Sequence, residues 1–150
     1  MALPDIVKGT YLDMLLGNAA EPEVFAPICG LTTRSFTHQV NTNDTFVPDC
    51  ADPEDVPKRR LVPTGEQWDL SGDGLYNLAQ GDAIRGATGV TRNYRFRIGR
   101  PAGSVVGTGY WAGPAMLTNA QYGGNTGNGE FGSISVAVAS DGEWEWVPPA

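Results

Sequence analysis

One histidine and two cysteines are the side chains of this sequence best suited to nucleophilic or thiolate chemistry. His38 lies in a run rich in β-forming residues without a nucleophile motif around it, so we expect a partly exposed strand histidine. Cys29 and Cys50 lack the second cysteine pair or the clustered histidines that a zinc site requires. In a reducing compartment both are expected to remain free thiols. The sequence therefore predicts a protein that is not an enzyme and holds no cofactor or metal.

A cluster of carboxylates could in principle hold a calcium ion. The acidic residues of this cluster are Asp44, Asp49, Asp52, Glu54 and Asp55. They lack the regular spacing and the glycine of a calcium-binding loop, so an acidic segment that faces solvent or a partner protein is favoured. The glycine-rich stretch 123–129 does not join a strand to a helix, which excludes a phosphate-binding loop and indicates a flexible one.

Aromatic residues in the C-terminal third offer a binding alternative. These are Tyr110, Trp111, Tyr122, Trp144 and Trp146. Exposed together, they would form a sugar-binding face, but a small β domain needs large aromatic side chains for its core, and core packing is favoured. A monomeric carbohydrate-binding or receptor-binding β-sandwich therefore stays open as the alternative function, and a hydrolase is a more distant one.

Length and composition limit the fold class. A chain of 150 residues fits one domain, and 20 glycines and 11 prolines with 41% hydrophobic residues favour many short strands over long helices. The N-terminus has no signal peptide pattern and no apolar run is long enough to cross a bilayer, so we expect a soluble protein made in the cytoplasm. A net charge of −7 argues against a surface that grips nucleic acid by its phosphates.

The regular elements are predicted from hydrophobic periodicity. Strands are expected at 31–40, 65–74 and 94–98, where apolar residues alternate with polar ones. A single helix is expected after Asp73, the predicted N-cap, with Gly86 or Gly89 as its end. The Asp141-Gly142 pair predicts a hairpin turn that the last residues close.

Residues 41–63 show neither a helical nor a strand period and contain Pro48, Pro53 and Pro57. A structureless loop of this length is uncommon inside a compact domain. We therefore expect an extended arm at about 41–63 that becomes ordered by contact with a neighbouring molecule.

The order of these features resembles the tail tube (major tail) proteins of long-tailed phages and related gene transfer particles. The resemblance spans nearly the whole chain and lies in its pattern. The matching segments are 8–12 (KGTYL), 28–33 (ICGLTT), the arm at 41–63, 65–74 (GEQWDLSGDG) before a helix, and 94–98 (YRFRI).

The resemblance implies an all-β fold, a β-sandwich or partial barrel with one short flanking helix. It also implies a structural virion protein whose hexameric rings stack into a tube for DNA ejection. The partners would be other copies of the chain, a tail terminator and baseplate or tail-tip proteins, with assembly in the host cytoplasm, no membrane, and DNA passing through without specific binding.

The residues expected to act in this assembly fall into three groups. The arm group adds Arg59 and Arg60 to the five acidic residues 44–55 named above. A basic strand with Arg92, Arg95 and Arg97 is the expected landing site for the arm of a neighbour. The candidate acidic residues of the channel wall are Glu66, Asp69, Glu143 and Glu145.

Overall fold

The computed structural model describes residues 6–99, 107–127 and 129–148. Antiparallel strands dominate them, and one short α-helix accompanies the strands. The strands are β1 (Leu12–Gly17), β2 (Phe25–Pro27), β3 (Leu31–Val47), β4 (Lys58–Leu75), β5 (Thr91–Ile98), β6 (Gly109–Gly123), β7 (Ser133–Ser140) and β8 (Glu145–Val147). The helical elements are the 3-10 turns η1 (Gly9–Tyr11) and η2 (Leu78–Gln80) and the helix α1 (Gly81–Ala87).

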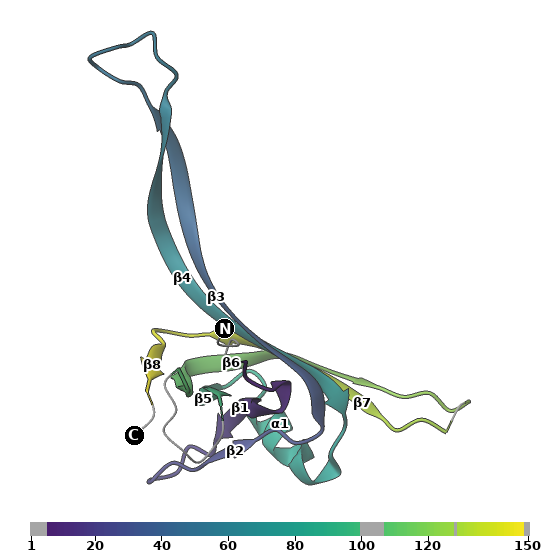
Figure 1. The fold of residues 1–150 in the computed structure, drawn as a ribbon. Coiled ribbons are helices and arrows are strands. Elements are labelled where there is room, and N and C mark those ends of the chain that lie inside the picture. The colour runs from purple at the N-terminus through teal and green to yellow at the C-terminus, as the bar shows by residue number, and fades with distance from the viewer. Residues whose placement is uncertain (1–5, 100–106, 128, 149–150) are drawn as a thin grey trace, which may run out of the picture.

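The strands form one sheet in the order β2-β1-β5-β6-β7-β4-β3, and β8 pairs with β6 beside this path. The sheet curls so that β3, at one end, comes close to β1, which lies next to the other end. Across the inside of the curl, Phe36 of β3 stacks on Phe96 of β5 with ring centroids 5.2 Å apart. The result is a partial barrel with α1 at the end away from a long projection formed by β3 and β4 (Figure 1). The expected all-β fold with one short flanking helix is confirmed.

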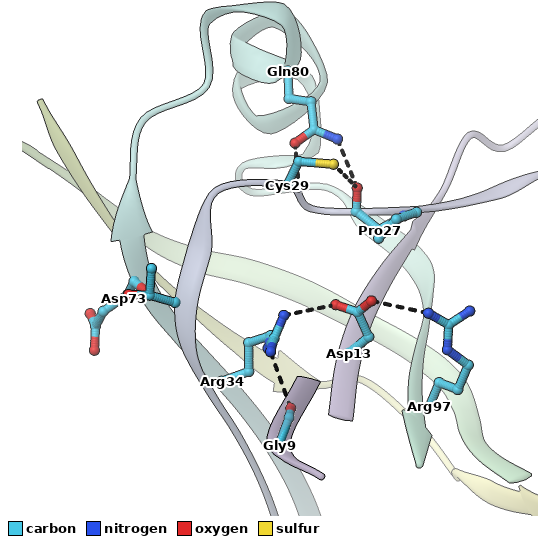
Figure 2. Close-up of polar contacts among 9 residues, drawn as sticks. Gly9, Asp13, Pro27, Cys29, Arg34, Asp73, Gln80 and Arg97 are labelled. Carbon is cyan, nitrogen blue, oxygen red and sulfur yellow. Dashed lines mark hydrogen bonds and ion pairs between the residues drawn. The ribbon is translucent and has the colours of Figure 1, made fainter. Parts of the chain in front are cut away.

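Asp13 of β1 connects β1 with β3, the two strands that face each other across the seam of the curled sheet. Its carboxylate accepts a hydrogen bond from Arg34 of β3 at 3.2 Å and another from Arg97 of β5 at 3.0 Å (Figure 2). Arg34 also donates to the carbonyl of Gly9 at 3.2 Å. Since β1 and β3 share no backbone ladder in the described residues, this charged bridge provides a polar link across the seam between them.

The core fills the inside of the curled sheet, mainly with alternate residues of β4, β5, β6 and β7. Tyr94 and Phe96 of β5 are 0% and 4% exposed, which confirms the predicted inward face of that strand. The other fully buried large side chains are Met14, Leu70, Leu117, Val136 and Val138. Ile84 and Ala87 of α1 close one end of this core.

The helix begins later than the sequence predicts. Asp73 is not its N-cap, because β4 continues to Leu75 while pairing with β3 on one side and β7 on the other. Asn77 caps the following turn η2 instead, accepting from the backbone N–H of Ala79 at 3.1 Å. Gln80 then ties the helical segment to the chain ahead of β3, accepting from the Cys29 N–H and donating to the Pro27 carbonyl, both at 2.7 Å (Figure 2).

The extended arm expected at 41–63 is present, but it is a paired hairpin and not a segment without strand structure. β3 and β4 stay paired from Leu31↔Gly74 to Val47↔Lys58, so the segment is a regular antiparallel hairpin, with a bulge beside Asn41/Thr42 and a loop at 48–57 (Figure 1). Both faces of the ribbon are exposed from residue 42 to residue 63. Apolar and polar residues alternate in a strand when only one of its faces is buried. Both faces of this ribbon are exposed, so its sequence shows no two-residue period.

The hairpin predicted around Asp141-Gly142 is also wrong. After this turn the chain crosses to β6, and β8 pairs with Tyr110, Trp111 and Ala112 instead of with β7. The indole of Trp144 determines this path, because it is buried and donates to the Pro114 carbonyl at 2.8 Å. A side chain at Gly113 would collide with that ring, its Cβ lying 2.4 Å from it.

Replacing Asp13 by Asn should lower the free energy of unfolding by about 2 kcal/mol, because two half-buried arginines would then face each other without a counter-charge. Urea denaturation measures the loss. Asp82→Asn is the matched control, since it breaks the exposed Arg85 pair, for which we expect little change. Equal losses in the two variants would contradict a special role for the seam.

Tyr94 gives a test at high pH. Burial raises the pKa of Tyr94 to about 12, and its hydroxyl has no hydrogen-bond partner in the described chain. Above about pH 10 the unfolded chain loses this proton first, so rising pH favours unfolding until the folded tyrosine also ionises. We expect Tyr94→Phe to remove roughly 2 kcal/mol of that alkaline destabilisation, measured as the pH dependence of the urea midpoint. An unchanged profile would show that the hydroxyl is solvated.

Candidate functional site

The distal β3–β4 hairpin, residues 42–63, is here called the arm. In the described part of the chain its two strands pair only with each other, because β7 joins β4 only at Asp69 and beyond. An isolated two-stranded ribbon is marginally stable in water, and its two free edges offer unpaired N–H and C=O groups to other strands. This geometry favours pairing between a free edge of the arm and a strand of another molecule.

The arm also exposes apolar side chains that the sequence analysis missed. The large hydrophobic residues exposed along the arm and its base are Val40, Phe46, Val47, Val56, Leu61 and Val62. Phe46 is 65% exposed, and Leu61 lies diagonally across the ladder on the same face, since Asp44 opposes Leu61 and Phe46 opposes Arg59. Val47 and Val62 lie on the other face, so the arm exposes apolar side chains on both sides, and contact with another molecule would bury them. The sequence does contain a signal for this surface, namely large apolar residues in a segment whose pattern gives them no place in a hydrophobic core.

All seven predicted arm residues lie on the arm, four of the acidic ones in the loop at its tip and Asp44 within β3, opposite Leu61. Asp49 and Asp55 shape the loop itself, accepting from the backbone N–H groups of Ala51 at 2.9 Å and Val56 at 2.8 Å. The three cations Lys58, Arg59 and Arg60 come after the loop, as the first three residues of β4. Lys58 and Arg60 share one face of the ribbon, and Arg59 lies on the other.

The three arginines of the predicted basic strand do not form one free patch. Arg97 pairs with Asp13, and the Arg95 guanidinium lies 3.8 Å from the ring centroid of Phe25 and 4.6 Å from that of Tyr110. Arg92 alternates to the opposite face of β5. Docking of a neighbour's arm on this strand stays a prediction, and two of its three arginines already have partners in their own chain.

A second candidate surface is the outward side of β3, β4, β7 and the end of β6, here called the polar face. Strand register brings together on it Thr33, Ser35, Thr37, Gln39, Gln67, Asp69, Ser71, Asp73, Asn119, Gln121, Ser135, Ala137 and Ala139. None of them is lysine or arginine. Gln67 donates to Asp69 at 2.8 Å and the hydroxyls of Ser35 and Ser71 bond to each other, so the face is hydrogen-bonded within itself.

The predicted channel residues divide among three places. Asp69 lies on the polar face, where it is joined by Asp73, which sequence reasoning had assigned to a helix cap. Glu66 points to the opposite face of β4, 3.4 Å from His38, whose ring stacks on Trp68. Glu143 and Glu145 both line a hollow beside Arg95 on the outer side of β5, β6 and β8.

The aromatic residues do not form a sugar-binding platform. Trp144 is buried and Trp111 packs against the core. The exposed members are separated, because Trp146 packs edge-on against Trp111 near the start of β6, whereas Tyr122 lies at its far end against Tyr76. Roughly 35 Å of extended strand lies between these two positions.

Metal and membrane features are lacking in the described ranges. No group of three metal-ligating side chains occurs there, and no helix is long and apolar enough to span a bilayer. Cys29 and Cys50 are both free and exposed.

No protein-family model matches the chain, and no curated protein sequence matches it. Solved structures do match. A chain in the virion of a native gene transfer agent superposes with a TM-score of 0.70 and 19% identity, covering 93% of this chain and 98% of that one. The SPP1 tail tube gives a TM-score of 0.65 at 13% identity, with 96% and 81% of the two chains covered.

A tube-terminating cap protein of the anti-feeding prophage gives 0.63 at 11% identity, with 98% and 95% covered. The tail of the empty gene transfer agent particle, described with C6 symmetry, matches with the same values as the native virion. Together these similarities establish that the chain has the fold found in tail tube structures.

Proposed function

We propose that this chain is the structural subunit of a virion tail tube. Copies close into hexameric rings, the rings stack, and DNA leaves the capsid through the lumen. The observation that carries the proposal is the polar face, a broad sheet surface with two carboxylates and no cation. The tail tube fold and the C6 symmetry described for one matching tail support it.

Ring closure follows from the free edges of the sheet behind the polar face. Within the described residues, no strand pairs with β3 opposite β4, or with residues 118–123 of β6 opposite β7. Pairing the β3 edge of one copy with this β6 edge of the next would continue the sheet around a ring. Closure of that kind removes edges that otherwise invite aggregation.

The polar face is the proposed channel wall. Lysine and arginine would bind the phosphates of the passing duplex and slow it, whereas hydroxyls, amides and the carboxylates Asp69 and Asp73 offer no such attraction. The arm is proposed to contact a neighbouring subunit. The further partners are a tail terminator and baseplate or tail-tip proteins, in a virion tail that is assembled in the host cytoplasm.

Electron microscopy of the purified protein tests the central proposal. Tubes or rings with six-fold symmetry and a central channel are the expected result. A strictly monomeric species by sedimentation at high concentration, without tubes or rings, would overturn it and favour the monomeric binding module instead.

Removing the arm should separate folding from assembly. Residues 42–64 are replaced by Asn-Gly, which joins Asn41 to Gly65 where they face each other across the hairpin. The free energy of unfolding should change by less than about 1 kcal/mol, because no core residue is lost, while tubes should no longer form. Normal tubes from this variant would remove the arm from the mechanism.

Making the channel wall basic should create DNA binding. With Asp69→Lys and Asp73→Lys together, we expect tubes to form and to bind duplex DNA at least about tenfold more tightly than wild-type tubes at low salt, with a steep salt dependence. A filter-binding assay on assembled tubes measures this. Glu21→Lys with Asp82→Lys is the control of equal charge change at exposed positions outside the strands of the polar face. Equal binding by both variants would contradict the proposed wall.

A further inference from the structure

The cationic side of the arm has a counterpart on the same fold, in the region of β8. Glu143 and Glu145 flank the buried Trp144, so they share the outward side of the segment and line one hollow together. Both glutamates are exposed, and no ion pair or hydrogen bond engages either carboxylate in the described part of the chain. A third carboxylate on the hollow, Glu23, is already bound by Asn93 at 2.9 Å.

The arm carries the matching charges at the matching spacing. Lys58 and Arg60 lie two residues apart on one face of β4, and Glu143 and Glu145 lie two residues apart on one side of their segment. In extended chain each pair is separated by roughly 7 Å. Two cations and two anions at equal spacing meet in register when the two segments lie side by side as neighbouring strands.

Both segments also have an unpaired backbone edge. In the described residues, β4 pairs only with β3 from Lys58 to Trp68, and β8 pairs only with β6. The arm projects from the body of its own subunit, whereas β8 lies on that body (Figure 1). The complementary edges are therefore suited to meet between two copies of the chain.

We propose that the arm of one subunit docks on a second copy by adding the distal edge of β4 to the free edge of β8, with Lys58 and Arg60 paired to Glu143 and Glu145. The proposal rests on the tail tube function and names the partner surface for the arm. It also assigns Glu143 and Glu145 to a contact between subunits instead of to the channel wall predicted from the sequence.

Charge reversal tests the docking. Lys58→Glu with Arg60→Glu and Glu143→Lys with Glu145→Lys are made as two separate double variants. All four positions are exposed, so both variants should fold, with unfolding midpoints close to that of the wild type. Each should raise the protein concentration needed for tube formation at least about tenfold, because like charges then face each other across the contact.

Mixing gives the decisive result. In an equimolar mixture the acidic arm of one variant meets the basic hollow of the other, and the basic arm meets the acidic hollow, so tubes should form from two proteins that fail alone. The quadruple variant should likewise assemble within about threefold of the wild-type concentration. The control Glu21→Lys with Asp82→Lys matches the charge change of the second variant and should assemble as the wild type does.

The outcomes separate the two proposals. A wild-type protein that forms no tubes overturns the proposed function. Wild-type tubes together with normal assembly of both double variants, or failure of the mixture and of the quadruple variant to recover, overturn the docking and leave the tube in place.

Discussion

The fold depends on holding a curled sheet closed without a backbone ladder at its seam. Strands β1 and β3 come together there, and the carboxylate of Asp13 binds Arg34 from one side and Arg97 from the other. Behind the bridge, Phe36 stacks on Phe96 and also lies against Trp111 and Trp144. The aromatic contacts supply the apolar burial at the seam. The charged bridge fixes how β1 and β3 are aligned, because a carboxylate between two guanidinium groups tolerates little displacement.

Strand β6 links the closed body to the surface proposed to face the lumen. Its first half pairs with β5 and β8, and its second half pairs with β7. A bulge between Leu117 and Asn119 marks the change. Bulges bend a strand and increase its twist, so one continuous strand can belong to the barrel at one end and to the polar face at the other.

Sequence reasoning succeeded where one face of a strand is buried. The alternation of Tyr94 and Phe96 with Arg95 and Arg97 predicted the inward face of β5, because burial imposes that period. It failed where no face is buried, as along the arm, and where tertiary pairing overrides local preference, as at Asp73, which strand pairing holds in β4. The polar face could not be found from sequence, because it is assembled from four strands whose register only the folded sheet defines.

The sequence of the arm is free of the constraints that core packing places on the body of the subunit. None of residues 42–63 belongs to the core cluster, so substitutions there leave the packing of the body unchanged. Under the proposed docking, selection for the right neighbour acts on the arm and on the exposed Glu143 and Glu145, whereas selection for a folded subunit acts on the core. Paired changes of charge at these two surfaces would alter which copies associate without changing the packing of the body.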